Sequence, residues 1–247
     1  MKIECIVTCV NYSDFLAESL PQNRVLFDRM IVVTAPEDKE TRRMCEFWHV
    51  ETVLTDAFES RWNKFCKGKG INAGLKKLEK TDWVLHLDAD IVLPPLTRRL
   101  LEKMDLDPSF VYGIDRHIVP NYKSWRKFLE KPPLQQENRT FVHADRFRIG
   151  TRVAPEHFDG YLPIGFFQLW NPKASGVTEY PDQHLDAGRG DMLFAAKWPR
   201  NKRAFIPEII GYHIESEVCG VMGANWDGRK TPPFTCEDYE SDGKAAA

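Results

Sequence analysis

The strongest constraint on the fold is one apolar stretch that ends in two acids. From Trp83 to Leu93 the chain reads Trp-Val-Leu-His-Leu-Asp-Ala-Asp-Ile-Val-Leu. The apolar run predicts a buried strand with the acids at its tip. Because side chains alternate along an extended chain, we expect Asp88 and Asp90 on one side and Ala89 on the other. Such carboxylates suit Mn²⁺ or Mg²⁺ together with phosphate and water oxygens. A solvated turn after a strand is the plainer alternative.

Strand and helix signals alternate through the first part of the chain. Apolar, β-rich runs predict strands at 3–10, 30–34 and 51–54, and segments between them predict helices at 15–20, 39–48 and 67–80. This order is typical of a doubly wound, mostly parallel sheet. After a helix at 96–104 the regularity fades, and a strand at 110–114 is expected to be capped by Asp115, Arg116 and His117. We therefore expect an α/β fold with a smaller mixed region.

Size and composition indicate one globular catalytic unit. The 247 residues suffice for one α/β core, which we expect to span 1–243, with a nucleotide-binding half (1–104) and an acceptor and catalytic half (105–243). The sequence 244–247 is interpreted as an artificial tail. With 43% hydrophobic and 28% charged residues and a net charge of -2, the chain lacks the overall basic charge of a nucleic-acid-binding protein.

The spacing of the cysteines and the first residues of the chain bear on the cellular compartment in which the protein is expected. The six cysteines form no Cys-x-x-Cys pair, which argues against a zinc site and favours reduced thiols. A strand is predicted directly after Met1 and Lys2, so we expect neither a signal peptide nor a membrane anchor. We expect a cytoplasmic protein, or one of the host cytoplasm if a virus encodes it.

Two motifs carry a family resemblance. Asp88-Ala89-Asp90 after its apolar strand resembles the Asp-x-Asp element of GT-A-fold glycosyltransferases, which transfer sugars from nucleotide donors. The segment from Lys67 to Gly74 is similar to the Lys-Gly-x-x-x-Asn-x-Gly helix of family-2-like members. The resemblance implies a GT-A fold, a nucleoside-diphosphate sugar as donor and Mn²⁺ or Mg²⁺ as cofactor.

The resemblance also implies a donor site at the carboxyl ends of the first strands, where α/β sheets bind ligands. Base and ribose are expected near five residues: Thr8, Cys9, Asn11, Tyr12 and Asp38. Glu37 is an alternative to Asp38, and helix capping would explain either acid equally well. The diphosphate is expected near five others: Lys69, Asp88, Ala89, Arg229 and Lys230. The last two lie in a tail that would close over the donor as a lid.

The metal ligands implied by the resemblance are Asp88, Asp90 and His213, the last in the final apolar strand. A satisfied core histidine is the plainer explanation for His213. Inverting members carry Glu-Asp-x-x-Leu-x-x-Arg at a helix start, and Asp191 matches their general base. Gly190 replaces the Glu and a lysine replaces the Arg, so Asp186 is kept in reserve.

The expected acceptor wall is an aromatic strand at 160–170, represented by Gly165, Gln168 and Trp170; a plain core strand is the alternative. Basic and aromatic residues between 121 and 152 favour an anionic acceptor, such as a modified DNA base. We thus expect a metal-dependent, inverting glycosyltransferase. A sugar-nucleotide nucleotidyltransferase is an alternative, although the loop after the first strand lacks a glycine-rich signature. A non-catalytic nucleotide-sugar or nucleic-acid binding module is another.

Overall fold

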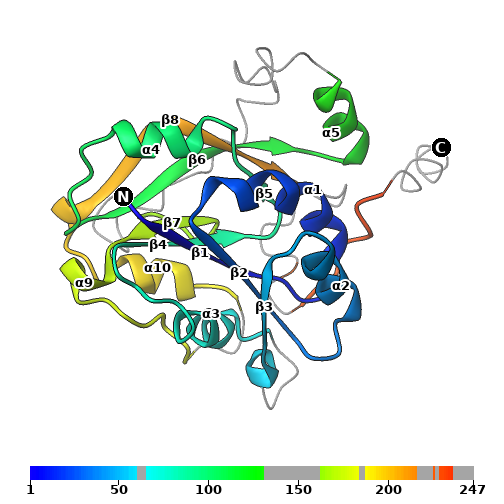
Figure 1. Ribbon diagram of the computed structural model, residues 1–247, viewed down its shortest axis with the longest axis horizontal. Helices are drawn as coiled ribbons and strands as arrows, with labels where there is room; N and C mark the ends of the chain where they lie inside the picture. The colour runs from blue at the N-terminus through cyan, green and yellow to red at the C-terminus, as the bar shows by residue number, and fades with distance from the viewer. Residues whose placement is uncertain (60–64, 131–161, 184–186, 216–224, 226–227, 236–247) are drawn as a thin grey trace, which may run out of the picture.

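A computed structural model describes residues 1–59, 65–130, 162–183, 187–215, 225 and 228–235 (Figure 1). Its centre is an eight-stranded sheet with the order β3-β2-β1-β4-β7-β6-β8-β5. The strands are β1 (Ile3–Thr8), β2 (Arg29–Thr34), β3 (Glu51–Leu54), β4 (Trp83–Asp88), β5 (Ile91–Val92), β6 (Val111–Val119), β7 (Phe167–Trp170) and β8 (Arg203–Ile214).

Helices connect these strands and cover the sheet. The α-helices are α1 (Ser13–Asn23), α2 (Lys39–Phe47), α3 (Lys67–Leu75), α4 (Thr97–Lys103), α5 (Tyr122–Leu129), α9 (Pro172–Ser175) and α10 (Gly190–Ala195). Short 3₁₀ turns are η1 (Arg24–Leu26), η2 (Asp56–Phe58) and η3 (Arg200–Lys202). No helix among the described residues is long and apolar enough to cross a membrane.

The first half of the sheet is parallel. β3, β2, β1 and β4 pair in parallel, and the side chains of β1, β2 and β4 are almost all buried on both faces. One face packs against α1 and α2 through residues such as Leu16, Leu20 and Cys45. The other packs against α3 and α10 through Ile71 and Phe194, and Figure 1 shows these helices on opposite sides of the sheet. The predicted doubly wound arrangement is confirmed.

The second half is mixed. β7 runs antiparallel to both β4 and β6, β8 is parallel to β6, and β5 is antiparallel to β8. β5 follows β4 after only two residues, yet it pairs at the far end of the sheet. The chain therefore passes from one half to the other at Ala89 and Asp90.

Three elements differ from the sequence-based expectation. β6 does not end at Ile114, because its pairing with β8 resumes after an irregularity at Ile114/Asp115 and continues to Val119. Asp115, Arg116 and His117 are thus strand residues and form no cap. α3 ends at Leu75 instead of near residue 80. Of the strand predicted at 160–170, the part that the structure describes begins at residue 162, and within that part only Phe167–Trp170 is a strand.

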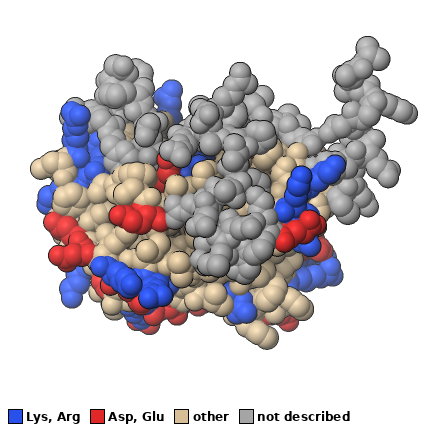
Figure 2. Space-filling view, turned by 90° about the horizontal axis from the view of Figure 1, so that it is seen from above, with Lys and Arg blue, Asp and Glu red and all other residues tan. Residues whose placement is uncertain are grey.

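Four cysteines are buried and free within the described residues: Cys5, Cys9, Cys45 and Cys66. This agrees with the predicted reduced thiols, since burial raises the pKa of the Cys5 thiol well above its ordinary value and keeps it protonated. On the described part of the face shown in Figure 2, acidic and basic side chains are interspersed.

Candidate functional site

The Asp-Ala-Asp element lies where the two halves of the sheet meet. β4 ends at Asp88, and Ala89 and Asp90 form a turn before β5. The Asp88 N–H donates to the Phe166 carbonyl (3.1 Å), whereas the Asp90 carbonyl accepts from the Ile214 N–H (3.0 Å). The expectation that both acids follow along one extended strand is wrong, because the strand stops at Asp88. Each acid is tied to a different part of the second half.

The Asp88 carboxylate is paired with a lysine. Lys67 Nζ, from the first residue of α3, makes an ion pair with Asp88 Oδ1, and His86 Nε2 lies 3.7 Å from the same oxygen. Burial raises the pKa of Asp88, Lys67 opposes this change, and the neighbouring Asp90 carboxylate adds to it. The His86 ring is fully buried, which lowers its pKa well below the ordinary value and keeps it neutral.

Asp90 and His213 are brought together by strand pairing. Ile91 pairs with His213 in the β5–β8 ladder, and His213 Nε2 lies 3.3 Å from Asp90 Oδ2. Burial alone would raise the pKa of Asp90, but the charge and hydrogen bond of His213 outweigh it and lower the pKa. His213 Nδ1 lies 3.3 Å from Glu215 Oε1 but makes no hydrogen bond within the described residues. This histidine is therefore at the predicted place beside Asp90.

A divalent cation would fit this pair. Within the described residues, no three His, Cys, Asp or Glu side chains are gathered as a ready-made metal site. Asp90 Oδ1, however, is buried without a hydrogen-bond partner, and the Asp90–His213 pair offers carboxylate and imidazole ligands. An ion held there would take further ligands from phosphate oxygens, from water, or from Asp88 once Lys67 releases it.

Asp191 is held at the start of α10. Asp191 Oδ2 accepts from the Gly165 N–H (2.8 Å) and Oδ1 from the Met192 N–H (2.8 Å). A Cβ on Gly165 would lie 2.7 Å from Asp191 Cβ, so only glycine permits this approach. The next residue, Phe166, is the one whose carbonyl binds Asp88. Two consecutive residues thus link Asp88 and the predicted base, Asp191.

The predicted acceptor wall divides into two kinds of residue. Gly165 contacts Asp191, as described. Gln168 and Trp170 are both 0% exposed. Gln168 Nε2 donates to the carbonyls of Pro163 (2.8 Å) and Asp191 (2.9 Å), and Trp170 Nε1 donates to the Val177 carbonyl (3.0 Å). Their prediction as acceptor contacts is corrected, because they are core residues with partners inside the protein.

A buried chain of hydrogen bonds joins α3 to Asp191. The Asn72 side chain accepts from the Tyr180 N–H (2.8 Å) and donates to the Tyr180 carbonyl (2.9 Å). Tyr180 Oη donates to Gln168 Oε1 (2.8 Å), and Gln168 holds the Asp191 carbonyl. Gly68, also in α3, lies so close to Pro181 that an added Cβ would meet its carbonyl oxygen at 2.0 Å. The helix that carries Lys67 therefore also positions Asp191.

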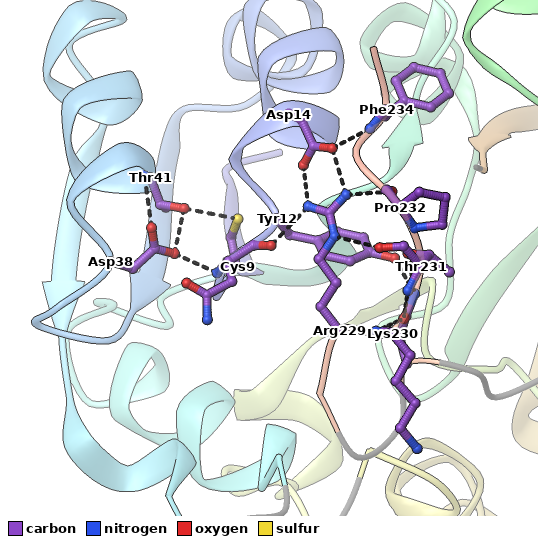
Figure 3. A network of polar contacts seen from close by, with 12 residues as sticks. Cys9, Tyr12, Asp14, Asp38, Thr41, Arg229, Lys230, Thr231, Pro232 and Phe234 are labelled. Carbon is purple, nitrogen blue, oxygen red and sulfur yellow. Dashed lines mark hydrogen bonds and ion pairs between the residues drawn. The ribbon is translucent and has the colours of Figure 1, made fainter. Parts of the chain in front are cut away.

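The loop after β1, where the donor was predicted to bind, is ordered by Asp38. Asp38 Oδ2 accepts from the Asn11 N–H (2.7 Å), Thr34 Oγ1 (3.2 Å) and Thr41 Oγ1 (2.7 Å), and Oδ1 caps α2 through the Thr41 N–H (3.1 Å). Cys9 Sγ lies 3.4 Å from Thr41 Oγ1 in the same network (Figure 3). Asp38 is buried and its contacts favour the capping interpretation. Thr8 stands beside Asp88 in the β1–β4 register.

The segment 228–235 crosses this loop, as Figure 3 shows. Arg229 Nη1 and Nη2 bind the two Asp14 oxygens (2.6 and 2.7 Å), and its other N–H groups donate to the carbonyls of Asn11, Thr231 and Pro232. All five N–H groups are therefore used within the protein. Arg229, predicted to contact the diphosphate, instead anchors the segment, and its guanidinium lies 4.9 Å from the Tyr12 ring centroid.

Tyr12 is fixed from both sides. Its ring stacks on Phe15 at 4.4 Å, and its hydroxyl accepts a hydrogen bond from Asn225 Nδ2. Burial raises the pKa of Tyr12, so the hydroxyl is protonated.

Lys230, the other basic residue predicted in this tail, is exposed and follows Arg229 directly. Asp186 lies outside the described residues, as does most of the basic segment between 121 and 152.

The lysine at the site is Lys67 and not the predicted Lys69. Residues two apart on a helix point about 200° apart, so only one can face Asp88. Lys67 shares the buried face of α3 with Ile71 and Gly74, whereas Lys69 is exposed. The i, i+4, i+7 spacing of apolar residues was the signal that could have identified Lys67.

A second residue missed by sequence reasoning is Arg116. Its guanidinium lies over the Phe166 ring, 4.5 Å from Cζ to the centroid. A charged residue inside an otherwise apolar strand could have pointed to Arg116. This is recognisable only once the strand is known to continue to Val119.

Comparisons with solved structures give weak likeness over part of the chain. Mannosyl-3-phosphoglycerate synthase from Rubrobacter xylanophilus is 17% identical, with 48% of this chain and 40% of that chain covered and a TM-score of 0.38. Glucosyl-3-phosphoglycerate synthase from Mycobacterium tuberculosis, in complex with Mn²⁺ and UDP-glucose, is 15% identical, with coverages of 47% and 43% and a TM-score of 0.36. The chain thus covers less than half of either protein. A search of curated proteins found no match.

The family model is the informative comparison. The model described as glycosyl transferase family 2 matches residues 4–157, which is more than half of the chain and includes β1 to β6 and the Asp-Ala-Asp element. It confirms the family to which the two sequence motifs pointed. The chain belongs to glycosyl transferase family 2, and its mixed α/β sheet has the GT-A fold of nucleotide-sugar transferases.

Proposed function

We propose that this protein is a divalent-metal-dependent glycosyltransferase that moves a sugar from a nucleoside-diphosphate donor to an acceptor hydroxyl with inversion. The observation that carries the proposal is a link between two carboxylates: the Gly165 N–H binds Asp191, and the carbonyl of the next residue, Phe166, accepts from the Asp88 N–H, two residues before the Asp90 of the Asp90–His213 pair (3.3 Å). Membership of family 2 supports the reaction class. A metal pair and a carboxylate base close together are what such a displacement requires.

On the donor side, the proposal assigns the base and ribose to the loop after β1. Thr8, Cys9, Asn11 and Tyr12 line this loop, and Asp38 acts through it by holding the Asn11 backbone. Lys67 and Lys230 are the cations proposed for the diphosphate, in place of Lys69 and Arg229. Ala89 lies between the two acids and is buried, so its contact with the donor would be through the backbone.

The reaction would be a single displacement. The acceptor oxygen forms a bond to the anomeric carbon as the bond from that carbon to the diphosphate oxygen breaks, and the acceptor proton passes to the Asp191 carboxylate. Each Asp191 oxygen accepts one backbone N–H, which leaves lone pairs for this proton. A divalent cation bound at Asp90 and His213 would supply a Lewis acid for the leaving nucleoside diphosphate.

The acceptor is proposed only by class. The reacting group of the acceptor is a hydroxyl, and we propose that the rest of the acceptor molecule carries negative charge. No feature of the described residues favours DNA over a smaller anionic acceptor, so the proposal does not extend to DNA.

The test is a binding and turnover screen with the purified protein. Nucleoside diphosphates and their glucose and mannose conjugates are added with Mn²⁺, with Mg²⁺ or with a chelator. The melting temperature and the release of nucleoside diphosphate are then measured. A metal-dependent stabilisation by one nucleotide, with release of its diphosphate from the sugar conjugate, is the expected result. Stabilisation without release in the presence of varied acceptors would favour a binding module, and release of pyrophosphate from nucleoside triphosphates would favour a nucleotidyltransferase.

A further inference from the structure

Arg116 lies at the centre of the site, yet no proposed step uses it. It stands on β6, opposite Gly211 of β8 and two residues from the position that pairs with His213. Its guanidinium packs over the ring of Phe166, whose carbonyl binds Asp88 and whose neighbour Gly165 binds Asp191. The cation therefore lies over the residue that links Asp88 with Asp191, near enough to Asp90 and Asp191 to feel the charge of both.

The guanidinium has an unused donor. Within the described part of the chain, its Nε is buried without a hydrogen-bond partner, and the ion pairs of the nearby acids Asp88, Asp90 and Glu215 are made with Lys67 and His213 instead. Four carboxylates influence it electrostatically: Asp90, Glu215, Asp88 and Asp191. Burial lowers the pKa of Arg116, and these acids oppose the change. A buried charge with unpaired donors is costly, so a partner from outside the chain is expected.

Charge balance alone does not explain this arrangement. An arginine that only neutralised the acids would be expected to contact one of them within ion-pair distance, as Arg229 contacts Asp14 at 2.6 Å. Arg116 is instead held over an aromatic ring, which stabilises the cation by its face and leaves the N–H groups at its edge for a ligand. Planar N–H groups of this kind bind phosphate in a bidentate manner.

We propose that Arg116 binds a phosphate group of a substrate next to the Asp90–His213 pair, an inference that rests on the proposed function. Two sources of this phosphate share the chemistry. One is the donor, whose diphosphate leaves in the reaction. The other is an anionic acceptor, whose phosphate would be oriented so that its hydroxyl faces Asp191.

The experiment is calorimetric titration of the wild type, R116M and R116K. The probes are the nucleoside diphosphate identified by the screen above, its monophosphate, each with Mn²⁺, and inorganic phosphate added to the protein saturated with that diphosphate. R99M serves as the matched control, because Arg99 is an exposed arginine on α4 outside the site. Far-UV circular dichroism and thermal unfolding check that each variant is folded.

R116M is expected to lose about ten- to a hundredfold in affinity for one phosphate probe, since charge-assisted hydrogen bonds are lost. R116K is expected to be intermediate and R99M unchanged. If R116M binds the nucleoside diphosphate more weakly and the monophosphate as the wild type does, the phosphate bound by Arg116 belongs to the donor. If R116M keeps its affinity for the diphosphate but no longer binds inorganic phosphate, that phosphate belongs to the acceptor. The inference is overturned if folded R116M binds all three probes as the wild type does. Failure of the wild type to bind any nucleotide would overturn the proposed function itself, and with it this inference.

Discussion

The parallel half and the mixed half of the sheet use their polar residues differently. In the parallel half, the acid beside the loop after β1 is committed to internal contacts, because Asp38 accepts four hydrogen bonds from Asn11, Thr34 and Thr41. At the mixed half, Asp90 Oδ1 and Arg116 Nε are buried without partners within the described residues. Buried groups without partners also occur in the first half, at Arg24 Nε and at the ring nitrogens of His86, but those of Asp90 and Arg116 are the ones that share their surroundings with Asp88 and Asp191.

This difference can be tested by asking which variants lose activity and which lose stability. Changes beside the unused groups should reduce turnover with little effect on folding. Changes in the satisfied network should reduce the free energy of unfolding.

The largest effect is expected for D90N. Replacing the carboxylate removes a charge beside His213 and should lower turnover by about 10²- to 10³-fold, since a metal contributes several kcal/mol to such reactions. Release of nucleoside diphosphate is measured across a Mn²⁺ titration. D105N, at an exposed acid between α4 and β6, is the control. Wild-type turnover by D90N would remove Asp90 from the metal assignment.

D38A should show the opposite pattern. It leaves the Asn11 N–H and the start of α2 without their acceptor in a buried site, which should lower the free energy of unfolding by about 3 kcal/mol. Denaturant unfolding measures this change. E37A, at the exposed neighbouring acid, should be nearly neutral. Equal stability of the two variants would mean that Asp38 is kept for the donor and not for the scaffold.

G165A should separate turnover from donor binding. The new Cβ would lie 2.7 Å from Asp191 Cβ and must displace it, so we expect turnover to fall about thirtyfold with donor affinity unchanged. The matched control is G190A, whose Cβ would meet its nearest neighbour, Tyr180, at an ordinary 3.6 Å. If both variants turn over equally, the position of Asp191 does not limit the reaction.

The smallest effect is expected for D14N, which weakens the anchor of segment 228–235. Burial would raise the pKa of Asp14, but its bonds to Arg229 and the Phe234 N–H outweigh it and lower the pKa from the ordinary 3.8. The ionised form therefore stabilises the fold above pH 3.8, and this contribution is lost as the pH falls through the folded-state value. We expect D14N to be about 1 kcal/mol less stable at pH 7.

The measurement for D14N is urea unfolding of both proteins at pH 7 and near pH 3. The difference in stability should shrink at the lower pH, because Asp14 of the unfolded wild type takes up a proton below about 3.8 whereas the folded state, with its lowered pKa, resists protonation. A constant difference would assign the effect to packing and not to charge.

The sequence predicted the parallel half well because its signals are local. Apolar runs, helix starts and the acids at Asp88 and Asp90 are each readable within about ten residues, and the family resemblance drawn from them is confirmed. Lys67 was missed for a local reason too, since the helix face was not used to choose between two lysines.

The mixed half was predicted less well because its contacts depend on strand pairing between distant segments. The place of His213 beside Asp90 follows from the β5–β8 register, which the sequence does not show. Arg116 was assigned to a cap because the irregularity in β6 hides the continuation of the strand. Gln168 and Trp170 were assigned to the acceptor, although only burial by β4, β6 and α10 decides their role.

The two hydrogen bonds between Asn72 and the Tyr180 backbone have a mechanical consequence. Because Lys67, Gly68 and Asn72 lie on one helix, a shift of α3 along its axis would move the partner of Asp88 and the support of Asp191 in the same direction. The position of α3 therefore sets the distance between the carboxylates of Asp88 and Asp191. Directed evolution that alters this spacing would have to change α3 and the segment around Tyr180 as a pair.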